Sequence, residues 1–255
     1  MSAWTIAVAN HKGGVGKTTT TFNVGFELSN TYNVLLIDLD PQASLTKDTG
    51  IDIDKHIGNV LGTTSRGTIS MKDIIVEIRP NLQLAPSSAE LAATDLSLIA
   101  RQNNEAILLE AINEVDTLFD LIIIDCPPGL GMLTVNALYA SHSVLIPTQL
   151  DARDISGIAL FIDTMNEIQS SYGECATLLG ILPTITDTRT KQEQTFLEAL
   201  RERPDLKLFN TIIPRTVRVR EARTQHLAIS EYEPTNPVSL AYQNLAKEII
   251  DRGTN

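Results

Sequence analysis

Apolar residues occur in several short, uninterrupted runs, and these runs predict the strands of a buried sheet. Residues 34–37 and 121–124 are entirely apolar, and a run of this length without polar alternation is typical of a parallel strand covered on both faces. Largely apolar runs of this kind predict strands at residues 4–9, 34–37, 82–86, 121–125, 143–147, 178–183 and 206–213.

Between these runs, apolar residues recur at helical spacing. We expect helices at residues 18–29, 57–61, 71–78, 91–99, 105–115, 133–140, 154–168, 192–203 and 239–251, with a loop rich in Gly, Thr and Ser between the second and third. Ser87 and Glu90 have the spacing of a capping box, so we expect Ser87 to cap the helix that follows. A chain of 255 residues is long enough for one large α/β domain, residues 1–255.

A glycine-rich segment separates the first predicted strand from the first helix. Residues 9–19 read Ala-Asn-His-Lys-Gly-Gly-Val-Gly-Lys-Thr-Thr. Glycines let the backbone turn tightly, so several N–H groups can point into one hollow at a helix N-terminus, where an anion is favoured. Lys17 could then reach the outer phosphates of a nucleotide, and the Thr18 hydroxyl could ligate Mg²⁺. The residues expected to hold the nucleotide are Lys12, Gly13, Gly14, Val15, Gly16, Lys17, Thr18 and Thr19.

The segment departs from the general phosphate-loop pattern in two places. His11 stands where that pattern requires glycine, and a second lysine, Lys12, precedes the glycines. This is the deviant Walker A signature, and the chain resembles the ParA/MinD family of ATPases, above all its ParA (Soj-like) partition branch. The resemblance implies a P-loop NTPase fold, that is, a doubly wound, mostly parallel β-sheet flanked by helices, with ATP and Mg²⁺ as cofactors. It also implies that Lys12 crosses a dimer interface to the phosphates held by the other subunit.

Acidic residues end two of the buried strands. Asp38 and Asp40 follow residues 34–37, and strand alternation sends both side chains to the same side, at the sheet edge where ligands bind. The resemblance implies that Asp40 orients or activates the attacking water and that Asp38 supports Mg²⁺ through water.

Residues 121–125 have the shape of a Walker B strand, which implies that Asp125 holds Mg²⁺. The segment after it, Cys126-Pro127-Pro128-Gly129-Leu130-Gly131, is similar to the family's D-C-P-P-x-L-G motif, and its prolines and glycines predict a rigid turn that could sense the γ-phosphate.

Residues 213–222 resemble the family's I-P-R-N-V-R-L-S-E-A segment, with Thr216 in place of asparagine and Arg220 in place of serine. The resemblance implies that Pro214 packs on adenine and that Arg218 lies on a DNA-binding face. Arg189, within a segment similar to the family's D-A-R-T, is a further candidate. The DNA-binding candidates are Arg189, Arg215, Arg218, Arg220 and Arg223.

The charge of the chain argues against an obvious nucleic-acid binder, because the net charge is −11. The charge is uneven, however: residues 186–255 hold 11 basic and 10 acidic residues, and residues 1–185 hold 9 and 21. Two cysteines without a C-x-x-C spacing, no apolar run of about 18 residues, and a first segment without signal-peptide blocks predict a reduced, cytoplasmic protein.

The leading interpretation is a ParA-like ATPase that dimerises on ATP, binds DNA without sequence preference and positions a plasmid, a chromosome region or a protein compartment. A ParB-like or other cargo adaptor would stimulate its hydrolysis, and the ATP-bound form would associate with the nucleoid. Two alternatives remain. A MinD-like, membrane-associated ATPase is disfavoured by the uncharged balance of residues 238–255, so no membrane partner is expected. A metabolic enzyme on the same scaffold, such as a ligase or an iron–sulfur reductase, is disfavoured because we do not expect Cys126 and Cys175 to share a surface.

Overall fold

A seven-stranded sheet forms the centre of the molecule. The computed structural model describes residues 2–62, 69–187 and 189–253, without the side chains of residues 152–156. Most of the Gly/Thr/Ser loop expected after residue 61, and the last two residues of the chain, therefore lie outside the described residues. The strand order is β3-β4-β2-β5-β1-β6-β7, and every neighbouring pair is parallel except β3 with β4. The strands are β1 Trp4–Val8, β2 Val34–Asp38, β3 Val76–Arg79, β4 Leu82–Ala85, β5 Leu121–Asp125, β6 Ser143–Thr148 and β7 Thr177–Pro183.

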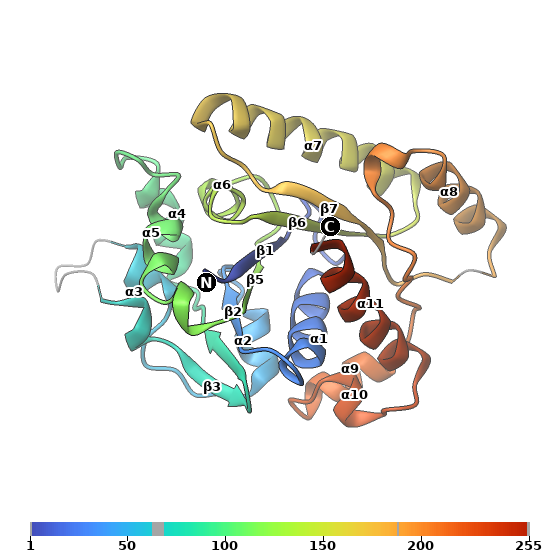
Figure 1. The fold of residues 1–255 in the computed structure, drawn as a ribbon, viewed down its shortest axis with the longest axis horizontal. Helices are drawn as coiled ribbons and strands as arrows, with labels where there is room; N and C mark the ends of the chain where they lie inside the picture. Colours follow the sequence, from blue (N-terminus) through green and yellow to red (C-terminus); the bar gives the residue numbers. More distant parts are fainter. Residues whose placement is uncertain (1, 63–68, 188, 254–255) are drawn as a thin grey trace.

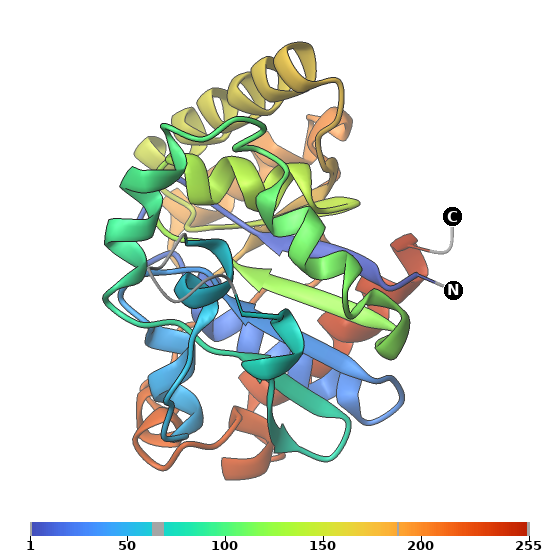
Figure 2. The ribbon, with the colours of Figure 1, turned by 90° about the vertical axis from the view of Figure 1, so that its left-hand side faces the viewer.

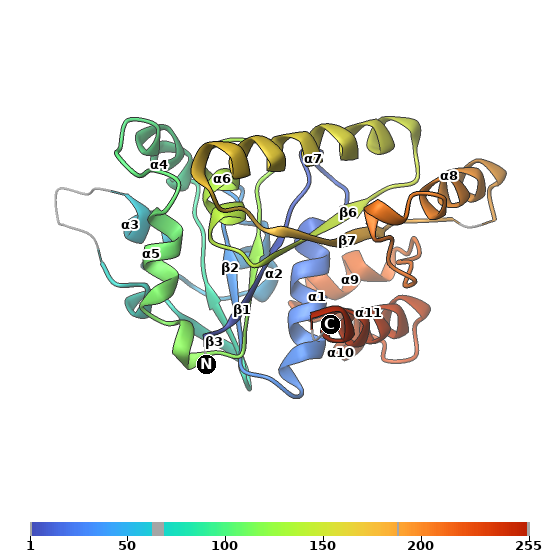
Figure 3. The same ribbon diagram turned by 45° about the horizontal axis from the view of Figure 1, so that its top comes forward.

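Helices cover both faces of this sheet, as Figures 1 and 3 show. One layer packs on the strand residues that include Leu36 and Ile123; its helices are α1 Lys17–Ser29, α2 Ser44–Thr49, α9 Arg218–Thr224, α10 Ile229–Tyr232 and α11 Pro237–Gly253. The other layer packs on the alternate residues, among them Ile37 and Ile124; its helices are α3 Ile57–Leu61, α4 Leu91–Leu98, α5 Ile107–Asn113, α6 Met132–Tyr139, α7 Ala152–Tyr172 and α8 Lys191–Arg201. Successive strand residues thus enter two separate cores, which explains why these strands are apolar without alternation.

The parallel register brings the functional strand ends to one level. Asp125 at the end of β5 lies opposite Val8 of β1 and opposite Asp38 of β2. The phosphate loop leaves β1 one residue later, and the two acidic strand ends therefore flank it. The mostly parallel α/β fold expected from the sequence is confirmed.

The strand expected at residues 206–213 is wrong. The segment runs beside β7 and donates two backbone hydrogen bonds to it, from Phe209 N to Ile181 O and from Ile213 N to Pro183 O, both 2.9 Å. It forms no strand because side chains of α11 take its other backbone groups. The guanidinium of Arg252 donates to the carbonyls of Lys207 and Leu208 at 2.6 and 2.8 Å, and Glu248 accepts from the N–H groups of residues 210 and 211.

Two further expectations near the sheet edge are wrong. Residues 71–78 are not a helix: a single 3₁₀ turn, Met71–Asp73, is followed by edge strand β3, whose hairpin turn to β4 places Asn81 in the left-handed region at φ 58°. Ser87 does not cap α4. Its hydroxyl instead donates to the carbonyl of Asp40 at 2.8 Å, and α4 begins at Leu91.

In Figure 2, both ends of the described chain lie on the same side of the sheet. The ring of Trp4 at the start of β1 lies against Gly253 of α11, where a Cβ would come within 2.3 Å of the ring. Of the helices that the structure describes, none combines the length and the apolar character needed to cross a membrane.

Candidate nucleotide site

The glycine loop has the backbone that its sequence predicts. Gly14 and Gly16 adopt φ angles of 77° and 93°, in the left-handed region that disfavours a side chain. Helix α1 begins at Lys17, directly after Gly16, and among the described residues no side chain caps it. Its first N–H groups are therefore available to an anion, which is the condition for phosphate binding at a helix N-terminus.

Hydrogen bonds from residues at the ends of neighbouring strands hold this loop in place. The hydroxyl of Thr184, after β7, donates to the carbonyl of Val15 at 2.7 Å, and the Gln149 amide donates to the carbonyl of Gly14 at 3.0 Å. Asn10 donates to Pro147 O at 2.7 Å. The loop is thus tied to the ends of β6 and β7 at several points and is pre-organised for a ligand.

The two lysines of the loop occupy different environments. Lys17 is buried, and its ammonium donates to the carbonyl of Lys12 at 3.0 Å. Burial lowers its pKa, while the carboxylates of Asp125 and Asp40 act in the opposite direction. Lys12 is about one-third exposed, and its ammonium lies 3.2 Å from a carboxylate oxygen of Asp151, just before α7. Lys17 therefore faces the inside of the site, and Lys12 lies at its rim.

The Asp125 carboxylate is fully buried in the site, without an ordinary hydrogen bond to either oxygen among the described residues. Burial, and then the charge of Asp38, raise the pKa of the Asp125 carboxyl, while the nearby Thr18 hydroxyl and Lys17 lower it. A buried carboxylate without partners is costly, and a divalent cation held at this point would relieve the cost. Thr18 and Asp125 thus fit Mg²⁺ bound together with nucleotide oxygens.

Within the described ranges, no group of three or more His, Cys, Asp or Glu side chains is arranged to hold a metal ion. This matches the usual preference of Mg²⁺ for one or two protein oxygens plus phosphates and water.

Asp38 and Asp40 are close together but differ in their contacts. Asp38 is fully buried: one oxygen accepts from Asp40 N at 3.2 Å, and the other accepts from the N–H and hydroxyl of Thr46 at 2.8 and 2.7 Å. Asp40 lines the cavity, and its Oδ1 accepts from Gln42 N at 2.8 Å. Asp38 therefore holds the segment that presents Asp40. Its expected support of Mg²⁺ through water stays a prediction.

A cavity of about 800 Å³ joins the loop to the C-terminal part of the chain. Gly13, Gly14 and Gly16 to Thr19 line one end, together with Asp40 and Pro128. Ile213, Pro214, Val238 and Tyr242 line the other end, which offers apolar surface to a flat ring. The cavity is large enough for a nucleotide, and Pro214 lines it; the adenine contact of Pro214 stays a prediction.

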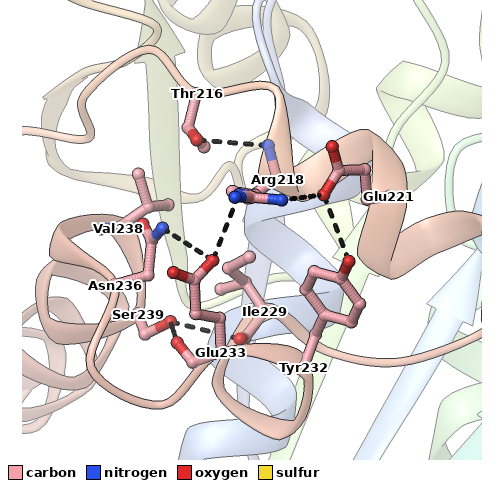
Figure 4. A network of polar contacts seen from close by, with 9 residues as sticks. All are labelled: Thr216, Arg218, Glu221, Ile229, Tyr232, Glu233, Asn236, Val238 and Ser239. Carbon is pink, nitrogen blue, oxygen red and sulfur yellow. Dashed lines mark hydrogen bonds and ion pairs between the residues drawn. The ribbon is translucent and has the colours of Figure 1, made fainter.

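The five candidate arginines come from adjoining segments, and three of them are paired with acids. Arg189 chelates Asp187 with two hydrogen bonds of 2.7 Å, Arg223 lies 2.7 Å from Asp48, and Arg218 lies between Glu221 and Glu233 at 2.7 and 3.5 Å (Figure 4). Backbone hydrogen bonds between Thr186 and residues 213 and 215 join the two segments. Arg215 and Arg220 line the cavity and make no ion pair within the described part of the chain.

Several residues that shape the site were not found from the sequence. Thr46, Ser87 and Thr184 position the segments described above, and Asp151 pairs with Lys12. Each acts through a contact between residues that are distant in sequence, for which no local pattern exists.

P-loop nucleotide hydrolases hold a nucleoside triphosphate at one edge of a parallel sheet, between a glycine loop, a buried acid and a second acidic segment. The site described above has this arrangement.

Comparisons with known proteins identify the family within this class. A family model described as an AAA domain matches residues 3–177. The chain is 36% identical to the sporulation initiation inhibitor protein Soj of Bacillus subtilis, over 97% of this chain and 98% of that protein. It is 35% identical to the chromosome-partitioning ATPase Soj of Thermus thermophilus, over 97% and 95%.

Among solved structures, the cobyrinic acid a,c-diamide synthase of Mycobacterium smegmatis, with a bound ATP analog and magnesium, is 32% identical. It matches with a TM-score of 0.84 over 99% of this chain and 96% of that one. The chain belongs to the ParA/MinD family of ATPases, whose cofactors are ATP and Mg²⁺.

Proposed function

We propose that this ParA-like ATPase forms an ATP-dependent sandwich dimer, binds DNA without sequence preference, and positions or segregates a plasmid, a chromosome region or a protein compartment. A ParB-like or other cargo adaptor stimulates a slow basal hydrolysis of ATP to ADP and phosphate. The protein is cytoplasmic and associates with the nucleoid when ATP is bound. The partition ATPases among the relatives support this proposal, since they match nearly the whole chain.

The position of Lys12 is the observation that supports the proposed dimer. Its ammonium lies at the rim of the phosphate loop, whereas Lys17 already supplies the interior positive charge. In the proposed dimer, Lys12 leaves Asp151 and reaches the phosphates held by the partner. Positive charge added at the transferring phosphoryl group stabilises the transition state, as an arginine finger does.

The remaining roles follow from the contacts of each side chain. Asp40 lines the cavity with its N–H and one oxygen already held, so it orients the attacking water. Lys17, with the loop N–H groups, binds the outer phosphates. Thr18 and Asp125 hold Mg²⁺, with Asp38 supporting through water; the bound ion neutralises charge on the phosphates. Val15 and Thr19 complete the loop, and Pro214 packs on adenine.

DNA binding requires two copies of the chain because one copy is acidic overall and three of its five candidate arginines are paired with acids. Pairing two subunits places both sets of arginines on one assembly. Phosphate contacts of this kind give salt-dependent, sequence-independent affinity.

A mobility-shift titration on random-sequence DNA tests the proposal, with ATP, ADP or no nucleotide. We expect a shift with ATP and Mg²⁺ alone, weakening steeply as salt is raised. Binding that is equal in all three nucleotide states would contradict it. Vesicles of anionic lipid, sedimented with the protein and ATP, form a second arm; co-sedimentation would favour the MinD-like alternative.

The metabolic alternative can be tested for one reaction, amide synthesis, because a diamide synthase is among the similar structures. One source of nitrogen for an amide is glutamine, and a cysteine that releases it acts as an activated thiolate. Cys126 is fully buried, and burial raises the pKa of its thiol; burial also raises the pKa of Cys175 to about 11. Neither cysteine has the environment of a nucleophile, which disfavours a synthesis that depends on a cysteine of this chain.

A further inference from the structure

An ion pair between a buried aspartate and a partly exposed arginine joins two segments that line the nucleotide cavity. Asp48 in α2 is 8% exposed, and its Oδ2 lies 2.7 Å from Nε of Arg223 in α9. The segment that leads into α2 lines one wall of the cavity through Asp40 and Ser44, and α9 lines the other through Arg220 and Arg223. The two helices are separated by about 170 residues of sequence, so this contact exists only in the folded chain.

Hydrogen bonds connect Asp40 to the helix that carries Asp48. Asp38 accepts from Asp40 N with one oxygen and from Thr46 with the other. Thr46 lies in the first turn of the six-residue helix α2, and Asp48 lies two residues further on in the same short helix. Because α2 is so short, a displacement of the segment around Asp40 moves Asp48 with it.

A second contact ties the same two elements. Gly50 ends α2 with φ 71°, and a Cβ built there would lie 2.6 Å from the ring of His226, just after α9. The end of α2 and the end of α9 are thus packed closely as well as paired by charge. The two contacts together leave α9 little freedom to move independently of α2.

We propose that Asp48 is a positioning residue that couples α9 to the segment of residues 38–49, so that closure of this segment on ATP is transmitted to α9. Removing Arg223 leaves the buried Asp48 carboxylate without its counter-charge, and removing the Asp48 charge ends the contact, so the link depends on both partners. The inference rests on the nucleotide site proposed above. It gives the arginines of α9 a physical connection to the nucleotide state.

Amide hydrogen exchange of α9, measured with and without a non-hydrolysable ATP analogue and Mg²⁺ at saturation, tests the coupling. In the wild-type chain we expect the analogue to slow exchange at residues 218–224 by about tenfold, within the range of coupling between linked sites. In Asp48→Asn we expect less than about a twofold change. Asp205→Asn breaks an exposed ion pair with Arg203 far from the cavity and is the matched control; it should behave like the wild type.

A double-mutant cycle separates coupling from simple loosening of the fold. Asp48→Asn, Arg223→Gln and the double variant should all lose the nucleotide response to the same extent, because they break one contact. A response that persists in Asp48→Asn, additive losses in the double variant, or a loss in Asp205→Asn would each overturn the inference. Calorimetry with ATP and Mg²⁺ distinguishes the two proposals: no ATP uptake by the wild type refutes both, and uptake with an unresponsive α9 refutes the coupling alone.

Discussion

At the scale of single residues, the polar groups of Asp38, Asp40 and Lys17 are held by hydrogen bonds with their neighbours, whereas, within the described chain, the oxygens of Asp125 are not. The oxygens of Asp38, the N–H of Asp40 and the ammonium of Lys17 all have partners at 2.7 to 3.2 Å. Asp125 has none of ordinary geometry among the described residues. Asp125 is one of the three residues predicted to hold Mg²⁺, together with Thr18 and Asp38, and a bound cation would satisfy its buried carboxylate.

Replacing Asp40 by alanine should separate binding from hydrolysis. We expect ATP affinity to change by less than about threefold and hydrolysis to fall by roughly 100-fold or more, because a group that orients or activates water contributes about that much. Phosphate release and calorimetry measure the two quantities. Asp52→Ala, at an exposed position, is the control. Hydrolysis by Asp40→Ala at the wild-type rate would rule out its role.

Arg218 offers a test of the DNA contacts that leaves the cavity intact, since it does not line it. We expect Arg218→Gln to weaken DNA binding in the ATP state and to reduce the slope of log K against log salt by about 1. The ATP affinity should not change. Arg203→Gln, which removes an exposed arginine elsewhere, should leave both quantities unchanged. An unaltered salt slope in Arg218→Gln would exclude Arg218 from the contacts.

At the scale of elements, the segment after β2 is held by the Thr46 hydroxyl. This hydroxyl donates to Asp38 and accepts from Ser87 N at 2.9 Å, so it joins β2, α2 and the start of the α4 segment. Thr46→Val keeps the shape and removes both bonds. We expect a loss of about 1–3 kcal/mol in the free energy of unfolding and slower hydrolysis, because Asp40 loses its support.

Urea denaturation and phosphate release measure these effects of Thr46→Val. The matched control is Thr195→Val in α8, whose hydroxyl makes only an exposed bond to Lys191 O. A stability change as small as that of the control would show that the buried bonds contribute little.

The strands of the sheet core could be predicted because their signal is local. Each is an apolar run whose neighbours supply the burial, as in β2 and β5. Residues 206–213 have the same pattern, yet Arg252 and Glu248 of α11 take the backbone groups that a strand would use. Whether such a run becomes a strand is decided by elements far away in sequence.

In the candidate site, too, features with a local sequence pattern could be predicted, and contacts between distant segments could not. The predictions for the glycine loop and Asp125 rest on local sequence patterns, and the prediction for Asp40 rests on the resemblance to the family. The cavity brings the loop, Asp40 and Pro214 together. The pairing of Arg218 with Glu233 was not predictable, since Glu233 reaches it through the turn after α10, whereas Glu221 is only three residues further along α9 (Figure 4).

At the scale of the whole molecule, the nucleotide cavity joins the phosphate loop to the C-terminal part of the chain, so a ligand should stabilise the whole fold. ATP with Mg²⁺ at about 100 times its dissociation constant should add about 2.7 kcal/mol. For a chain of this size, that raises Tm by roughly 5–10 °C. Thermal scans with ATP, with and without a chelator, measure the shift. A rise that survives removal of the metal would contradict the role given to Thr18 and Asp125.

The central claim is that ATP joins two copies of the chain, with Lys12 of each copy reaching the phosphates bound by the other. The mass of the protein in solution tests this claim most directly. Light scattering after size exclusion of Asp40→Ala should report one chain without nucleotide and two chains with ATP and Mg²⁺. Adding Lys12→Ala should leave ATP binding in place and return the mass to that of one chain. A dimer that forms equally well without Lys12, or a single chain that binds ATP and never pairs, would contradict the account.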